Sequence, residues 1–147
     1  MSIPMNIHGR TAPAQEPVLT VLTEQEVQDL LDQTRFARLG TVDPQGYVHI
    51  TPVNIVADGG KIYFRTAAGS KLTQLLLEEK VTLQADRVEG GQAYSFNVFA
   101  RARLLTDSQE LEYVSSLPLD PWLDTEKLEW VELSPQKLEG RRFRLGS

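Results

Sequence analysis

The chain has 147 residues, the size of one domain, and 41% of them are hydrophobic, which is enough for a packed core. Its 15 basic and 20 acidic residues give a net charge of −5, which argues against general binding to nucleic acids or to anionic membranes. The absence of cysteine excludes disulfides, iron–sulfur clusters, thiol nucleophiles and cysteine-ligated zinc. We therefore expect a cytoplasmic protein whose chemistry depends on a bound organic cofactor or on no cofactor.

The N-terminal segment lacks the pattern of regular structure. Residues 1–17 are polar, contain three prolines and show no hydrophobic periodicity. We interpret them as a flexible arm in front of a single domain over residues 18–147. His8 lies in this arm, and we interpret it as a solvated residue rather than a ligand.

The first regular element is a helix. The run Thr23-Glu24-Gln25-Glu26 matches a capping box, in which the Thr hydroxyl and the Glu carboxylate satisfy free backbone amides. Val27, Leu30 and Leu31 follow at helical spacing. The pattern predicts a short amphipathic helix that ends near Thr34.

Three strands are predicted next, over residues 36–42, 47–57 and 61–66. Turns at residues 43–46 and 58–60 separate them, because Pro and Gly favour the backbone angles that turns need. We expect the three strands to form an antiparallel meander.

The rest of the chain alternates between short helices and strands. We expect a helix capped by Ser70, strands over 81–88 and 93–106, a helix capped by Asp107, a strand over 128–133, and then a helical turn and a short strand. About six strands broken by short helices fit a small antiparallel barrel, mainly β with short helices (α+β).

The sequence contains no motif for a protein nucleophile, such as Gly-x-Ser-x-Gly, and no Walker loop or Gly-x-Gly-x-x-Gly. With two histidines and no cysteine, we also expect no catalytic metal site. We therefore name no catalytic residue and no metal ligand.

The junction between the third strand and the next helix is a candidate phosphate site. Free amides at such a junction point outward, Thr66 and Ser70 add hydroxyls, and Lys71 and Arg65 add positive charge. A phosphate monoester would suit this set. An alternative of equal weight is that Ser70 only caps the helix and Lys71 is solvated.

A second candidate is the run His49-Ile50-Thr51-Pro52-Val53-Asn54. Pro52 removes a hydrogen-bond donor in the middle of a strand, so the strand lacks a neighbour at that point. Thr51 and Asn54 could then face a polar heterocycle. The alternative is an edge strand with an ordinary proline.

Six segments in register resemble one known family. They are residues 36–46, 49–54, 62–71, Asp86, 95–102 and 140–143. Their order resembles that of the pyridoxamine 5′-phosphate oxidase-like flavin-binding proteins, in particular the nitroimidazole-reductase-like branch. The resemblance covers about residues 23–145 and implies a six-stranded antiparallel split β-barrel.

The resemblance also implies a homodimer with flavin mononucleotide (FMN) in two clefts at the subunit interface. Lys71 and Ser70 would hold the phosphate, with Thr66 and Arg65 beside them. The remaining implied cofactor-binding residues are Thr51, Pro52, Val53 and Asn54 at the ring, His49 near the ribityl chain or phosphate, and Phe96, Asn97, Trp130, Arg141 and Arg142, some of them from the other subunit. The chain departs from many members at Ala100, where they have Gly, and at Phe96, where they have Trp.

The hypothesis that follows is an FMN-dependent oxidoreductase acting on a small organic substrate, in which the protein orients the cofactor and supplies no nucleophile. One alternative is a reductase of the same fold that uses a deazaflavin. Another is a flavin- or haem-binding protein without turnover, in which His49 would be the axial ligand.

Overall fold

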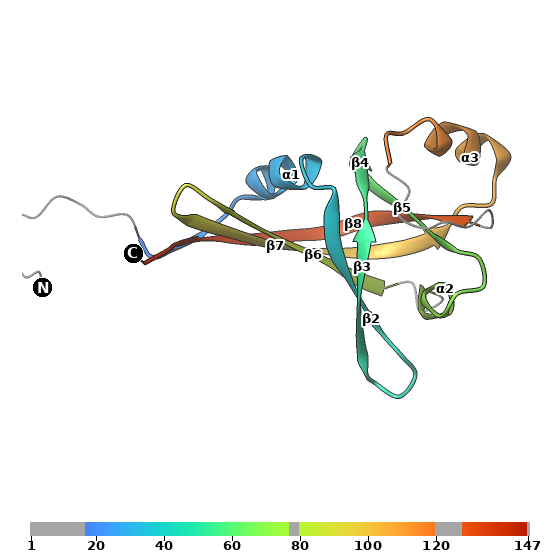
Figure 1. Cartoon of the computed structure of the whole chain (residues 1–147), viewed down its shortest axis with the longest axis horizontal. Coiled ribbons are helices and arrows are strands. Elements are labelled where there is room, and N and C mark those ends of the chain that lie inside the picture. The colour runs from blue at the N-terminus through green and yellow to red at the C-terminus, as the bar shows by residue number, and fades with distance from the viewer. Residues whose placement is uncertain (1–16, 77–79, 120–127, 147) are drawn as a thin grey trace, which may run out of the picture.

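The computed structural model describes residues 17–76, 80–119 and 128–146, without the side chains of Lys71 and Leu75. Eight strands form one antiparallel sheet in the order β3-β2-β6-β7-β8-β5-β4, and β1 pairs with the far end of β8 (Figure 1). The strands are β1 (Leu19–Val21), β2 (Phe36–Val42), β3 (Val48–Asn54), β4 (Val56–Asp58), β5 (Lys61–Ala67), β6 (Lys80–Glu89), β7 (Gln92–Leu104) and β8 (Leu128–Arg144). Six of these are long, which agrees with the expected split barrel, and β1 and β4 are three-residue additions.

Three short helices accompany the sheet: α1 (Glu24–Asp32), α2 (Lys71–Leu75) and α3 (Ser108–Ser115). Their predicted caps are confirmed. Thr23 and Glu26 form the reciprocal capping box of α1, Ser70 accepts from the amide of Thr73, and Asp107 caps α3. In the described part of the chain, no helix has the length and apolar character that crossing a lipid bilayer requires.

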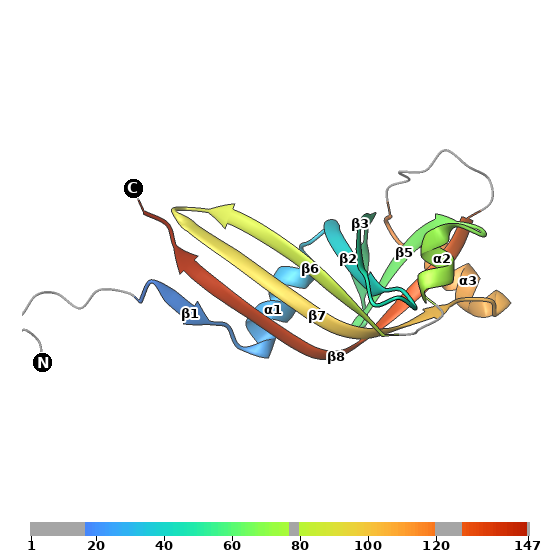
Figure 2. The same cartoon turned by 90° about the horizontal axis from the view of Figure 1, so that it is seen from below.

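The core lies on one face of the long strands β6, β7 and β8. Figure 2 shows these strands as a curved ribbon, with β1 and α1 beside one half and β2–β5, α2 and α3 gathered at the other. The predicted alternation is confirmed, since β6 and β7 bury one face. The buried residues on these strands are Val81, Leu83, Ala85, Phe96, Val98, Ala100 and Ala102.

Gly140 lets α1 approach the sheet. A Cβ atom at this position would lie 2.9 Å from Cγ2 of Val27 and 3.1 Å from Cβ of Phe96. Val27 is fully buried. The missing side chain of Gly140 therefore sets the distance between α1 and the strands.

The expected meander of three strands is wrong. β2 and β3 form the predicted hairpin, but β3 is one edge of the sheet and β5 pairs with β4 and β8. The predicted strand over 47–57 is also interrupted at Ile55, which is fully buried and donates its amide to the carbonyl of Arg35 at 2.9 Å. This interruption lets β3 and β4 belong to opposite edges of the sheet.

The expected helical turn after residue 133 is also wrong, because β8 continues to Arg144 as one strand of 17 residues. Pro135 is accommodated by a bulge: Phe99 pairs with Lys137 and Ala100 pairs with Pro135, so Gln136 is an extra residue. A bulge is a position where a strand tolerates a residue without an amide donor.

Thr41 in β2 carries a buried polar group that the fold leaves unsatisfied. Its hydroxyl has no hydrogen-bond partner among the described residues, and the residue is 1% exposed. Replacing Thr41 with valine should therefore raise the free energy of unfolding by about 1 kcal/mol, since it removes an unpaired buried hydroxyl at nearly constant shape. Urea unfolding measures this. Thr34→Val is the control and should lower stability, because the Thr34 hydroxyl donates to the carbonyl of Leu30 at 2.7 Å. A loss of stability in both variants would contradict the assignment.

Candidate functional site

A cleft of about 240 Å³ lies between β3, β5 and the start of α2. The sheet curls so that its edge strand β3 comes close to β5, although the two strands do not pair. The cleft is lined by Thr51, Pro52, Val53, Asn54, Arg65, Thr66, Ala67, Ser70, Leu72 and Leu128. Both sequence candidates, the run around Pro52 and the junction before α2, therefore contribute to one cavity.

Pro52 lies on an edge strand, as the alternative interpretation of this run expected. It pairs with Arg38 on one side, and the other side of β3 has no strand neighbour in the described sheet. The position is consistent with a strand that faces a cleft, because a proline at a sheet edge loses no ladder hydrogen bond.

A chain of hydroxyl groups forms the end of the cleft next to α2. Thr66 is 5% exposed, and its hydroxyl lies 3.1 Å from that of Ser70, which lies 3.1 Å from that of Thr73. Ser70 also accepts from the amide of Thr73 at 3.2 Å. Ser70 is therefore a helix cap and a cleft residue at once, so the two interpretations of this residue are compatible.

The loop before α2 already holds one negative group. The amide of Gly69, which has a φ of 71°, donates to Oε1 of Glu129 at 3.0 Å. An anion that used this amide would have to displace the Glu129 carboxylate. The expectation of freely available loop amides is therefore wrong at Gly69.

Arg65 is fixed at the wall of the cleft. Its guanidinium lies 5.2 Å from the centre of the Trp130 ring and donates to the carbonyl of Leu119 at 3.3 Å. Arg65 and Trp130 are also cross-strand partners on β5 and β8. Trp130 does not itself line the cleft, and it contacts the cleft residue Arg65 through this cation–π interaction.

The side chain of Lys71 lies outside the described part of the structure. Its backbone opens α2 directly after Ser70.

His49 does not line the cleft. Its Nε2 atom lies 2.7 Å from the carboxylate of Asp43, which also accepts from the amides of Gln45 and Tyr47 at 2.9 Å each. The hydrogen bond to His49 and those two amides hold the pKa of Asp43 below its usual value. His49 thus stabilises the turn between β2 and β3, and its Nε2 is engaged there.

Three more expected residues lie away from the cleft of the same chain. Phe96 is a core residue and is 4% exposed. The side-chain amide of Asn97 donates to the carboxylate of Glu139 at 3.4 Å. Arg142 is at the far end of β8, where it donates to the hydroxyl of Thr20 at 3.5 Å. Their sequence positions did not reveal this, because β7 and β8 are long enough to reach both ends of the molecule.

The sequence interpretation missed three cleft residues and one neighbour: Ala67, Leu72, Leu128 and Glu129. Leu72 lies on the five-residue helix α2, where it packs partly against the core and also lines the cleft. Leu128 and Glu129 approach the site through the pairing of β8 with β5, for which the sequence carries no local signal.

The cleft fits the two parts of a flavin nucleotide. Val53, Leu72 and Leu128 provide apolar surface for a flat ring, and Thr66, Ser70 and Arg65 provide donors for an anionic group. Among the described residues, no group of three or more His, Cys, Asp or Glu comes together as a metal site.

A network of charged residues and tyrosines connects α3 to the sheet. Arg103 donates to Glu110 at 2.6 Å and to Glu132 at 3.1 Å, and the hydroxyl of Tyr63 donates to Glu132 at 3.3 Å. The hydrogen bonds from Arg103 lower the pKa of Glu110. Burial and the Glu132 carboxylate raise the pKa of Tyr63 to about 12, and a hydrogen bond to Asp58 raises that of Tyr113.

The raised pKa of Tyr63 predicts how stability depends on alkaline pH. An unfolded tyrosine ionises near pH 10, so the folded state binds the proton more tightly than the unfolded state. The contribution is fully present below pH 10 and should be lost as the pH rises from about 10 to about 12. Denaturant unfolding at pH 8 and pH 11 should show this loss, with a smaller loss in Tyr63→Phe. An equal loss in that variant would contradict the assignment.

Comparison with known proteins identifies the family. The family model described as pyridoxamine 5′-phosphate oxidase matches residues 23–142. The chain belongs to the pyridoxamine 5′-phosphate oxidase family.

Solved structures of similar proteins share the fold, and a curated sequence is also similar. A Corynebacterium glutamicum protein provisionally named a pyridoxamine 5′-phosphate oxidase superposes with a TM-score of 0.83 and 34% identity, over 91% of this chain and 99% of the other. A Mycobacterium smegmatis protein described as FAD-binding gives a TM-score of 0.75 and 32% identity, over 86% of this chain and 99% of the other. An uncharacterized Mycobacterium tuberculosis protein is 32% identical over 91 residues, which are 62% of this chain and 83% of that protein.

Proposed function

We propose that this member of the pyridoxamine 5′-phosphate oxidase family binds FMN in the β3–β5–α2 cleft and is an oxidoreductase for a small organic substrate. The observation that carries the proposal is that one cleft combines apolar walls with the Thr66–Ser70 hydroxyl pair and the fixed guanidinium of Arg65. The FAD-binding relative from Mycobacterium smegmatis supports a flavin.

The bound flavin would supply hydride transfer, and the protein would bind and orient it. Ser70, Thr66 and Lys71 would hold the phosphate, with Arg65 as a second cation. Backbone groups of residues 51–54 and the Asn54 amide would contact the polar edge of the ring. Leu72 and Leu128 would exclude water from its apolar part.

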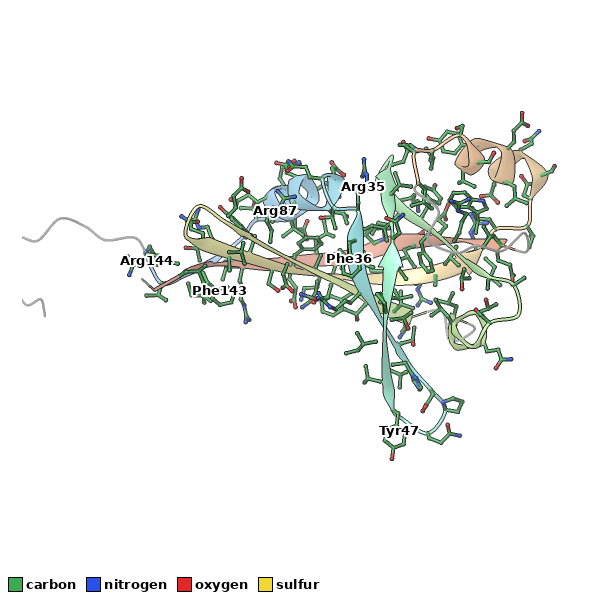
Figure 3. All side chains as sticks on the ribbon, in the orientation of Figure 1. Arg35, Phe36, Tyr47, Arg87, Phe143 and Arg144 are labelled. Atoms are coloured by element: carbon green, nitrogen blue, oxygen red, sulfur yellow. The ribbon has the colours of Figure 1, made fainter. Side chains whose placement is uncertain are left out.

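A homodimer is part of the proposal. The outer face of β3 carries Val48 and Ile50, which are 64% and 68% exposed, and Tyr47 at the hairpin tip is 72% exposed (Figure 3). This apolar strip continues through Pro52 into the cleft. The cleft of one chain contains none of Asn97, Arg141 and Arg142, and in the proposed dimer these residues of the partner subunit would complete the cofactor site.

Absorption and mass analysis of the purified protein tests the proposal. An isoalloxazine spectrum together with the mass of FMN would support it. The mass of FAD or of a deazaflavin would replace FMN as the proposed cofactor. With any of these cofactors bound, Asn54→Ala should change the absorption spectrum of the ring. A colourless protein that takes up no flavin on titration would contradict the proposal.

We expect the Glu129 carboxylate to weaken the binding of FMN. This carboxylate accepts a hydrogen bond from the amide of Gly69 at 3.0 Å, so its negative charge would repel a phosphate that approached the same amide. Glu129→Gln should lower the Kd for FMN about two- to fivefold, as expected for removing one unfavourable partly solvated charge pair. Fluorescence titration measures this, with Glu112→Gln on the exposed surface of α3 as the control. Weaker binding in Glu129→Gln would mean that Glu129 supports the site.

A further inference from the structure

Arg65 is held at the wall of the flavin cleft by groups that carry no charge. Its guanidinium lies 5.2 Å from the centre of the Trp130 ring and donates to the carbonyl of Leu119 at 3.3 Å. Within the described part of the chain, no carboxylate forms an ion pair with Arg65. The positive charge of Arg65 is therefore available to an anion in the cleft, which Arg65 lines.

Arg103 on β7 shows the other way in which this fold holds an arginine. It donates to Glu110 at 2.6 Å and to Glu132 at 3.1 Å, so two carboxylates neutralise its charge. Such an arginine connects α3 to the sheet and offers little charge to a ligand. Arg65 has the opposite surroundings, since an aromatic face and a carbonyl orient a guanidinium and leave its net charge in place.

Trp130 is itself fixed on the side of α3. It packs against an apolar cluster whose buried members are Val56, Tyr63, Leu105 and Val114, and its carbonyl accepts from the amide of Leu105 at 3.0 Å. α3 lies at the same end of the sheet as β5 and the cleft (Figure 2). An arginine side chain loses conformational freedom when it binds a ligand, and a fixed ring beside it reduces that cost in advance.

We infer that Trp130 is a positioning residue, which holds the Arg65 guanidinium toward the phosphate of FMN. It thereby makes the cleft prefer FMN to riboflavin, which has the same ring and no phosphate. Trp130 does not line the cleft, so it acts on the ligand only through Arg65. This inference rests on the proposed binding of FMN in the cleft, and it adds a determinant of specificity that lies outside the cleft.

The ratio of the Kd values for riboflavin and FMN tests the inference, because contacts to the ring cancel in this ratio. Flavin fluorescence titration of the full chain gives both values. Trp130→Leu should raise the Kd for FMN about tenfold and leave that for riboflavin within about twofold of the parent. Trp130→Tyr keeps an aromatic face and should restore most of the affinity for FMN. Equal weakening for both flavins in Trp130→Leu would overturn the inference, since Trp130 would then support the cleft as a whole.

A double-mutant cycle separates positioning from direct contact with the ligand. In the Arg65→Met background, Trp130→Leu should change the Kd for FMN by less than about twofold, because the residue through which Trp130 acts is absent. Additive losses from the two substitutions would overturn the inference.

Leu111→Ala is the control for a general loosening of the apolar cluster. Leu111 lies on α3 and packs against the same cluster as Trp130. This variant should lower the melting temperature and keep the ratio of the two Kd values within about twofold of the parent. A loss of FMN preference equal to that in Trp130→Leu would overturn the inference. A parent protein that binds FMN and riboflavin equally would also overturn it, whereas one that binds neither flavin would contradict the proposed function as well.

Discussion

Gly140→Leu should lower the free energy of unfolding by more than about 3 kcal/mol, at the upper end of the cost of overpacking a core. Even the Cβ atom would lie 2.9 Å from Val27 and 3.1 Å from both Phe96 and the carbonyl of Ser95. Because Val27 and Phe96 are both buried, neither can move away without opening the core. Urea unfolding measures the loss, and α1 should lose its amide protection first.

Gly146→Leu is the matched control, since nothing lies within 4 Å of a Cβ atom at that position. It should change stability by less than about 0.5 kcal/mol. Comparable effects in the two variants would show that the close approach of α1 to β8 does not determine stability.

Ala67→Trp should raise the Kd for FMN at least about 100-fold, which corresponds to about 2.7 kcal/mol. Ala67 ends β5 and is one of the residues that line the cleft, so an indole at this position should reduce the 240 Å³ that is open to a ligand. Flavin fluorescence measures the change in affinity. Far-ultraviolet circular dichroism should remain that of the parent, because Ala67 is only partly buried and the core does not have to accommodate the indole.

The control is Ala68→Trp, one residue further along. Ala68 is exposed and does not line the cleft, so its affinity for FMN should stay within about twofold of the parent. If Ala67→Trp bound FMN as tightly as Ala68→Trp, the flavin would have to bind elsewhere.

Local elements were predictable from the sequence because their determinants are neighbours in the chain. The capping box of Thr23 and Glu26, the turn at residues 43–46 and the buried alternation of β6 and β7 each depend on residues within one element. The long-range pairing was not predictable in the same way. Placing β3 and β5 near each other but unpaired depends on the curvature of the whole sheet.

In the candidate site too, contiguous runs could be predicted from the sequence, whereas contacts that depend on long-range pairing could not. The runs 51–54 and 65–70 were found because each is contiguous, and the structure brings them into one cleft. Glu129 was missed because it reaches Gly69 through the pairing of β8 with β5. Asn97 and Arg142 were grouped with the cleft, yet in one chain they lie elsewhere on β7 and β8. Their proposed role depends on a second subunit.

The most direct measurement is a titration of the ¹⁵N-labelled protein with FMN. If the cleft is the flavin site, amide resonances of Thr51, Val53, Asn54, Thr66 and Ser70 should shift together and saturate at one equivalent per chain. Saturable binding that leaves all five unchanged, or no binding at millimolar FMN, would contradict the account.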